Sequence, residues 1–206
     1  MDVDVTTGPM RPAQEGAAQE GAVQAGLVQE GAAQAGLVHA VLGSPVGPVA
    51  VAVEDGAVTH LRLPRTDGTP AADDVGERVD PGDDPVLAEA VRQLAAYFAG
   101  ELRDFDLPLR YAGTAFQRKV WDGLRRVPYG TTTSYGALAE SVGLDPRTTA
   151  RAVGAANGAN RMAIVVPCHR VIGAGGKLVG FAAGLDRKRT LLDLERRVVG
   201  GPALLF

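Results

Sequence analysis

The chain holds few of the residues that build disulfide frameworks and metal clusters. Cys168 is the only cysteine among 206 residues, and the three histidines lie far apart. One cysteine excludes an internal disulfide and a multi-cysteine zinc site, and the histidines form no cluster in the sequence. We therefore expect no metal and a reducing compartment.

Long apolar runs are also missing. No stretch reaches the ~20 apolar residues of a membrane-spanning helix. The acidic first residues lack the basic and apolar regions of a secretory signal. These two absences predict a cytoplasmic protein with no membrane partner.

The charges that are present are divided unevenly along the chain. Residues 110–206 carry 15 Lys and Arg against 6 Asp and Glu, whereas residues 1–109 carry 6 against 18. A basic half joined to an acidic half suggests a polyanionic partner such as nucleic acid. Solvated helix faces would explain the same charge runs, so charge alone leaves both interpretations open.

The N-terminal segment is repetitive. Residues 13–37 are five pentapeptides: AQEGA, AQEGA, VQAGL, VQEGA and AQAGL. A glycine at every fifth position destabilises a helix, and no apolar stripe at helical spacing survives it. We predict that residues 1–37 form a disordered tail outside the functional part of the chain.

Residues 38–109 are predicted to form a small α+β domain. Alternating apolar segments separated by Pro/Gly-rich and Glu-Asp-Gly turns indicate antiparallel strands within residues 38–63. The acidic, Gly- and Pro-rich residues 65–85 are expected to be a long surface loop. Apolar residues at helical spacing predict a helix over residues 85–100.

Residues 110–206 are predicted to be mainly helical. An apolar strand is expected at residues 163–166, and a tight glycine-rich turn at residues 173–176. The expected helices begin at capping residues or at proline and cover about residues 114–128, 134–142, 146–158 and 186–197. The fold class is therefore α+β: a small antiparallel-sheet and helix domain, then a helical domain with a winged-helix-like helix-turn-helix.

The helix-turn-helix consists of the two short helices joined at Gly143. Its second helix is lined with alanine and glycine around Arg147 and Arg151. Small side chains allow a helix to pack closely on another helix, or to approach a nucleic-acid groove with an arginine free to enter it. Both interpretations stay open.

Cys168 carries the strongest chemical signal. It lies in the sequence VVPCHRV, where His169 and Arg170 can favour a thiolate, and cationic neighbours lower a thiol pKa from about 8.5. The alternative is a buried structural cysteine. Glu195 would complete a Cys–His–Glu relay if the fold brought it to His169, and would otherwise be an exposed ion-pair partner.

These motifs together resemble the O6-alkylguanine-DNA alkyltransferase family. The resemblance covers about residues 38–197 and includes the sequence SPVG near the start of the predicted sheet. The matching motifs are FQRKVW at 116–121, PYGTTTSY at 128–135, RAVG at 151–154, NGAN at 157–160 and IVVPCHRVIG at 164–173. The resemblance implies irreversible transfer of the alkyl group from O6 of guanine to Cys168, once per molecule.

The resemblance also implies the partner and the catalytic residues. It implies a monomer acting on double-stranded DNA that carries O6-alkylguanine, with O4-alkylthymine as a second candidate lesion and no cofactor, because the DNA supplies the alkyl group. Cys168 would accept that group, and His169 would act on it as a base through a water. Glu195 would orient His169, and Asn160 would brace the adjacent turn.

A second set of residues is implied for binding DNA and guanine. Tyr135 would press on the flanking phosphate and Arg151 would fill the gap left by the flipped base. Ala152 and Gly154 would let their helix enter the minor groove. The expected guanine pocket is lined by Trp121, Val171, Phe181, Ala182 and Ala183.

The chain departs from the family at three places. Phe181 stands where many relatives have tyrosine, Ala183 where they often have glycine, and Arg161 follows Asn160 in place of a proline-rich step. Two rival classes are a thiol hydrolase and a helix-turn-helix regulator with a structural cysteine. Papain-like hydrolases keep their histidine far from the cysteine in sequence.

Overall fold

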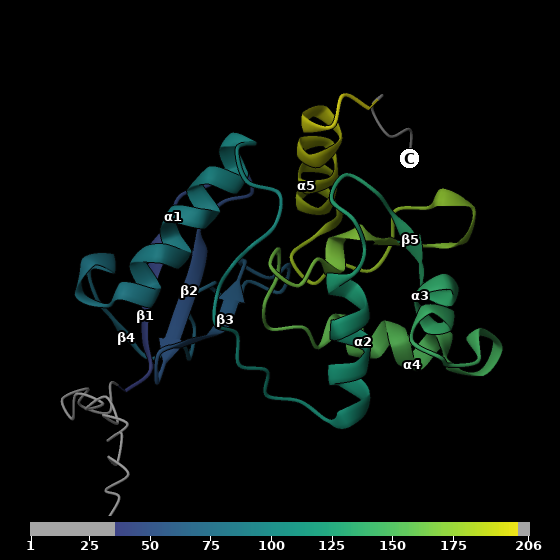
Figure 1. Cartoon of the computed structure of the whole chain (residues 1–206), viewed down its shortest axis with the longest axis horizontal. Coiled ribbons are helices and arrows are strands. Elements are labelled where there is room, and N and C mark those ends of the chain that lie inside the picture. The colour runs from purple at the N-terminus through teal and green to yellow at the C-terminus, as the bar shows by residue number, and fades with distance from the viewer. Residues whose placement is uncertain (1–35, 202–206) are drawn as a thin grey trace, which may run out of the picture. The chain divides into compact units, whose positions relative to one another are not determined.

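The computed structural model describes residues 36–201 (Figure 1). Nearly all of residues 1–37, the segment expected to be a disordered tail, lies outside the described residues, as do residues 202–206. The described chain begins with a four-stranded sheet in the order β3-β2-β1-β4 and continues into a mainly helical part. The predicted α+β fold class is confirmed.

The sheet follows the alternating segments of the sequence. β2 pairs antiparallel with β1 and β3, and β4 pairs parallel with β1 at the edge. Asp55 and Gly56 both have positive φ, 48° and 69°, as a two-residue type I′ hairpin requires. The strands are β1 (Val38–Leu42), β2 (Val49–Glu54), β3 (Ala57–Arg62) and β4 (Glu77–Arg78).

Helix α1 (Pro85–Ala99) packs on this sheet, as predicted. The Asp84 side chain accepts hydrogen bonds from the first-turn amides, and Gly100 ends the helix with φ 79°. The segment before α1 is more ordered than the expected surface loop. It buries Ala71 and Val75 and contains the 3-10 turn η1 (Pro81–Asp83) and β4, which pairs with β1 at the edge of the sheet.

The helical part confirms the caps predicted at Thr114 and Ser134. Thr114 forms a capping box with Gln117, and Ser134 caps the first helix of the helix-turn-helix. The second helix begins at Pro146 as predicted, and Asp145 caps it. Strand β5 (Thr133–Ser134) pairs parallel with β6 (Val171–Ile172) beside them. The helices are α2 (Ala115–Arg125), α3 (Tyr135–Ser141), α4 (Pro146–Gly158) and α5 (Leu185–Val198).

The strand predicted at residues 163–166 is wrong. After one bridge between Leu61 of β3 and Met162, the chain turns sharply, and Ile164 has a positive φ of 74°. The segment is apolar because all four of its side chains are buried, and burial alone does not separate a strand from a turn. The turn delivers the chain to the 3-10 turn η2 (Cys168–Arg170). The glycine-rich segment that follows forms η3 (Ala174–Gly176).

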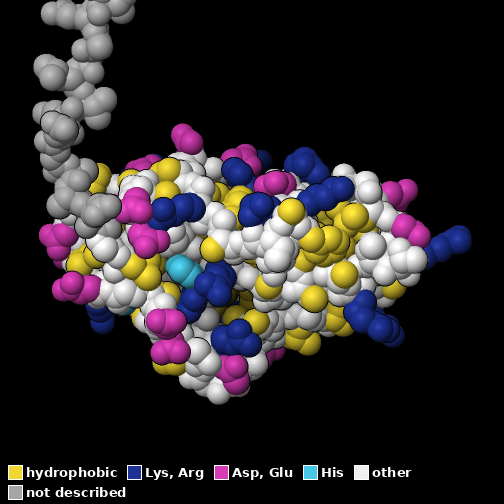
Figure 2. Space-filling view, turned by 90° about the horizontal axis from the view of Figure 1, so that it is seen from below, with side chains coloured by type: hydrophobic (Ala, Val, Ile, Leu, Met, Phe, Trp, Pro, Cys, Tyr) yellow, Lys and Arg dark blue, Asp and Glu magenta, His cyan; other side chains and the backbone are white. Residues whose placement is uncertain are grey.

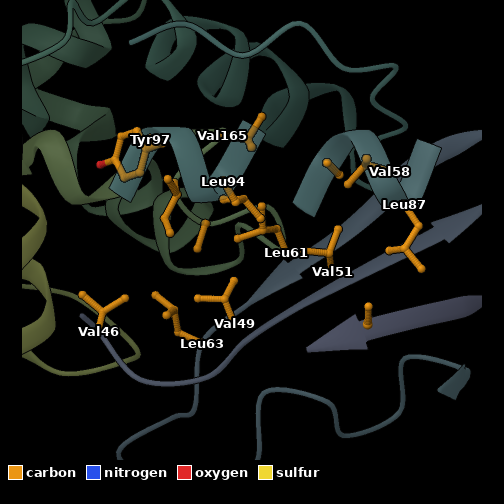
Figure 3. Close-up of a cluster of buried hydrophobic side chains, with 14 of the residues drawn as sticks. Val46, Val49, Val51, Val58, Leu61, Leu63, Leu87, Leu94, Tyr97 and Val165 are labelled. Carbon is orange, nitrogen blue, oxygen red and sulfur yellow. The ribbon is translucent and has the colours of Figure 1, made fainter. Parts of the chain in front are cut away.

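Two clusters of buried side chains stabilise the described chain. The first lies between the sheet and α1 and also takes in Ile164 and Val165 from the turn before Cys168 (Figure 3). The second surrounds Trp121 and includes Cys168. The active-site turn is therefore held between both cores. Across residues 36–201, no helix is long and apolar enough to span a membrane.

Candidate active site

Cys168 lies at the wall of a cavity of about 920 Å³ to which both parts of the chain contribute. Its side chain is 6% exposed. Residues of the helix-turn-helix, of the end of β3 and of the segment after β3 contribute to its lining. The lining includes Trp121, Tyr135, Asn160, Phe181, Ala182, Ala183, Arg62 and Arg65.

The relay left undecided by the sequence is assembled. His169 is fully buried, and its Nε2 lies 2.8 Å from Oε1 of Glu195, which is also fully buried. Nδ1 of His169 is buried and has no hydrogen-bond partner among residues 36–201. Because Nε2 faces a carboxylate, we assign the proton to Nε2, which leaves the Nδ1 lone pair available as a base.

The pKa values of the relay fit this assignment. Burial raises the pKa of Glu195, but the hydrogen bonds and charges of His169 and Arg170 outweigh it and lower the value to about 2. Burial lowers the pKa of His169 below its usual value, against the opposing effect of Glu195. His169 is therefore neutral and Glu195 ionised near pH 7.

The thiol differs from the expectation that its cationic neighbours favour a thiolate. Burial raises the pKa of Cys168 above its usual value, only partly offset by Asn160, Lys188 and nearby backbone N–H groups. Arg170 does not turn toward the sulfur. Its guanidinium bonds Glu195 and the Val127 carbonyl, and it stacks on Tyr129. Cys168 is a thiol at rest and needs a base.

Asn160 holds the turn that precedes the cysteine. Its Nδ2 donates to the Val166 carbonyl at 2.8 Å, and its Oδ1 accepts from the Met162 amide at 2.9 Å. These bonds span the strained residue Ile164 and fix the approach to Cys168. The geometry therefore places Asn160 beside the thiol and across the turn.

Lys188 connects the cysteine turn to the loop around Phe181 (residues 180–184), which we call the substrate loop, and the sequence reasoning missed this role. Lys188 is fully buried, and its Nζ donates to the carbonyls of Val171, Val179 and Gly180. Its spacing could have indicated this placement. Lys188 shares one face of α5 with residues 191, 192 and 195, which are all buried.

Tyr97 is the second residue that the sequence reasoning missed. It lies on α1, far from the motifs, and its hydroxyl donates to Oε1 of Glu195 at 2.9 Å. No local pattern signals this contact, because the two residues are 98 positions apart. The apolar spacing that predicted α1 did not include Tyr97, which the structure places on the buried face of the helix.

Of the residues expected to contact DNA, Tyr135 and Gly154 line the same cavity, and Arg151 and Ala152 do not. Arg151 and Ala152 are exposed on α4, and Gly154 lies against the ring of Tyr135. Tyr135 begins α3 and lines the cavity, and burial and Cys168 raise its pKa. Figure 2 shows Lys and Arg side chains spread over much of one face.

The pocket expectation needs one correction, at Val171. Its side chain is fully buried in the second core cluster and does not line the cavity, because β6 pairs with β5 and directs it inward. Val171 contributes instead the carbonyl that accepts from Lys188. No group of three or more His, Cys, Asp or Glu side chains in the described part of the chain is placed to hold a metal ion.

A helix-turn-helix beside a buried Cys–His–Glu relay defines a class of DNA-binding proteins that act through a thiol. Residues 37–111 match the family model "6-O-methylguanine DNA methyltransferase, ribonuclease-like domain", and residues 115–197 match its "DNA binding domain". The chain therefore belongs to the methylated-DNA–protein-cysteine methyltransferase family. Members of this family repair DNA by alkyl transfer to a cysteine.

Individual relatives agree with this assignment. The methylated-DNA–protein-cysteine methyltransferase of Mycolicibacterium paratuberculosis is 51% identical over 168 residues, which cover 82% of this chain and 98% of the relative. The constitutive Bacillus subtilis protein is 44% identical over 154 residues, 74% and 92% of the two chains. The crystal structure of Mycobacterium tuberculosis OGT in complex with DNA has a TM-score of 0.69 and 46% identity, covering 81% and 96%.

Proposed function

We propose that Cys168 receives the alkyl group from O6 of a guanine flipped out of double-stranded DNA. The observation that carries this proposal is the arrangement of His169. Its Nε2 is held by Glu195, while its buried Nδ1 has no hydrogen-bond partner among the described residues, and His169 directly follows Cys168, a buried, protonated thiol. A base with one free nitrogen beside a thiol that needs deprotonation is suited to nucleophilic catalysis.

The reaction balances without another reactant. His169 Nδ1 takes the thiol proton through a water, and the thiolate attacks the alkyl carbon. The sulfur–carbon bond forms as the carbon–oxygen bond breaks, and the electron pair stays on guanine, which takes up a proton. Since the thioether lacks a good leaving group, Cys168 is not regenerated and each molecule acts once.

Access to the alkyl carbon requires the base to leave the duplex. A stacked guanine does not present its O6 substituent to a thiol inside a cavity, so the nucleotide must flip. Arg151 is exposed on α4, where it can fill the gap that the flipped base leaves in the stack. Ala152 and Gly154 are small residues, which allow this helix to approach the minor groove closely. Tyr135 connects this surface to the cavity that holds Cys168.

The same residues support two further proposals. We place the boundary between the sheet domain and the alkyl-transfer domain near residue 110, at the end of the first of the two segments that match family models, 37–111 and 115–197. We also propose that the protein works in the cytoplasm, because a reactive cysteine that must stay reduced is suited to a reducing compartment.

A labelled-methyl assay tests the proposed reaction. With excess duplex DNA containing O6-methylguanine, label should accumulate to about one methyl group per protein molecule, and Cys168→Ser should accept none. Continued release of free product would support a thiol hydrolase. Tight lesion binding without labelled protein would support a regulator with a structural cysteine. Either result would contradict the proposal.

A further inference from the structure

Tyr97 joins the sheet domain to the catalytic relay. The residue is fully buried, and its ring packs edge-on against Phe98 and Tyr129 with centroid separations of 5.3 and 6.0 Å. Figure 3 shows its hydroxyl oxygen pointing out of the apolar cluster. That hydroxyl donates to Oε1 of Glu195 at 2.9 Å. A residue of the N-terminal domain therefore contacts the carboxylate that holds His169.

Arg170 bonds both oxygens of Glu195, whereas the other donors are divided between them. Oε1 accepts from Tyr97, from His169 Nε2 at 2.8 Å, and from Arg170 Nη2 and Nε at 3.0 and 3.2 Å. Oε2 accepts from the Gly130 amide and from Arg170 Nε, both at 3.0 Å. Tyr97 and His169 share one oxygen, so any rotation of the carboxylate that follows the loss of one donor also moves the imidazole.

Tyr97 is a neutral donor throughout the physiological range. Burial and the charge of Glu195 raise its pKa well above the usual value, so the hydroxyl keeps its proton. A neutral donor stabilises the carboxylate without placing another positive charge beside the imidazole. The titratable and charged groups that face this carboxylate or its donors are Tyr97 on α1, Tyr129 before β5, His169 and Arg170 on η2, Lys188 on α5, and Arg103 near Tyr129.

We propose that Tyr97 is a positioning residue for alkyl transfer and acts on His169 through Glu195. This inference rests on the proposed function, in which His169 is the base. Without the hydroxyl, Oε1 carries more negative charge and the carboxylate loses one of the bonds that fix its orientation. His169 then retains its proton to higher pH and is less well aligned with the water that leads to the thiol.

The variant that tests this is Tyr97→Phe, which keeps the ring. Single-turnover transfer from saturating O6-methylguanine duplex should be about tenfold slower near neutral pH, the size expected for one hydrogen bond to a charged group. The acidic limb of the rate profile, measured between about pH 5.5 and 9, should move to higher pH. Duplex affinity should stay unchanged.

Tyr129→Phe is the matched control. Tyr129 belongs to the same ring cluster, but its buried hydroxyl has no hydrogen-bond partner in residues 36–201. Removing that hydroxyl should leave both the rate and its pH profile as in the parent protein. An equal loss in Tyr97→Phe and Tyr129→Phe would show that the cluster serves packing, and would overturn the proposal.

A double-mutant cycle with His169→Gln separates positioning from packing. If Tyr97 acts through His169, Tyr97→Phe should slow alkyl transfer in the parent protein. In a protein that already carries His169→Gln, it should have no further effect on the rate. Equal slowing in both backgrounds, or none in the parent, would overturn the role of Tyr97 alone. No rate loss in His169→Gln itself would overturn the proposed relay. All four proteins are compared at a temperature where circular dichroism shows them folded.

Discussion

Phe181 lies in the cavity wall, packed against both core clusters, and its ring offers no hydrogen-bond donor. The neighbouring amides of Ala182 and Ala183 donate to no other group within residues 36–201. A leaving guanine carries negative charge until it is protonated, and one hydrogen bond to a charged group contributes about 1.5–3 kcal/mol. We infer that these two amides take the place of the hydroxyl that many relatives have.

Phe181→Tyr should therefore speed alkyl transfer. The added hydroxyl supplies one more donor to the leaving guanine, and each ~1.4 kcal/mol of transition-state stabilisation raises the rate about tenfold. Duplex affinity should change little, because it comes mainly from phosphate contacts. Quenched-flow transfer at saturating DNA, paired with binding to the same duplex, measures both quantities. A level or slower rate would mean that the amides already suffice.

Single residues also show which parts of the site could be predicted from the sequence. Cys168 and His169 were found because they belong to one contiguous motif. Glu195 was a candidate relay partner that the resemblance then supported, and the resemblance supplied Asn160. Tyr97 and Lys188 were missed because their polar groups matter only after folding brings them to Glu195 and to the substrate loop. The thiol pKa was misjudged for the same reason: adjacency of Arg170 in sequence says nothing about where its guanidinium points.

In the proposed function, helix α4 is the element that contacts DNA. Val153 and Ala156 face the core, whereas Arg151 and Ala152 are exposed. Arg151 makes no hydrogen bond or ion pair within the described part of the chain, so its guanidinium is available to a ligand. The small residues of α4 therefore lie on both its buried and its exposed face, and the sequence alone could not show which residue lies on which face.

Arg151→Ala should impair repair of duplex DNA far more than reaction with free O6-alkylguanine base. Base flipping leaves a gap in the stack only in the duplex, and a gap that stays unfilled costs a few kcal/mol. The rate of alkyl transfer from duplex DNA should therefore fall at least about tenfold. Arg147→Ala, on the same helix, is the charge-matched control and should fall much less. Equal losses on duplex and free base would show that Arg151 serves the fold or the thiol.

The turn at residues 163–166 shows why one element was mispredicted. Its positive φ at Ile164 costs about 1–3 kcal/mol, which a local sequence preference would avoid. The two hydrogen bonds of Asn160 and the burial of Ile164 and Val165 hold the strained conformation. The helices were predicted well because their caps are local. This turn depends on contacts with β3 and the sheet core.

On the scale of the whole molecule, the sheet domain supports the active site at several points. Besides Tyr97, the Thr66 amide donates to the Ala182 carbonyl in the substrate loop, and Arg187 of α5 donates to the Val46 carbonyl. The segment after Asn160 continues the edge of β3 through two backbone hydrogen bonds with Leu61. Thus stability of the sheet and geometry of the thiol are physically linked.

His60 lies at the junction where β3 contacts the segment after Asn160, and it makes the stability of the protein depend on pH. It lies on β3, and its burial, with Arg62 and Arg161, lowers its pKa to about 4. The unfolded chain binds a proton at about pH 6.5, so between about pH 6.5 and 4 the unfolded state holds more protons. The contribution of His60 to the free energy of unfolding therefore falls as the pH drops through this range.

His60→Gln should reduce that fall. The side chain is only about half buried, so solvent screening limits the effect, and we expect a difference of roughly 1 kcal/mol between about pH 7.5 and 5. Urea unfolding of both proteins at the two pH values measures it, and groups common to both, such as Glu195 and His169, cancel. Arg161→Gln, which keeps the histidine but removes one repelling charge, should give a smaller reduction. Identical pH dependence in all three proteins would show that the junction does not depress the pKa of His60.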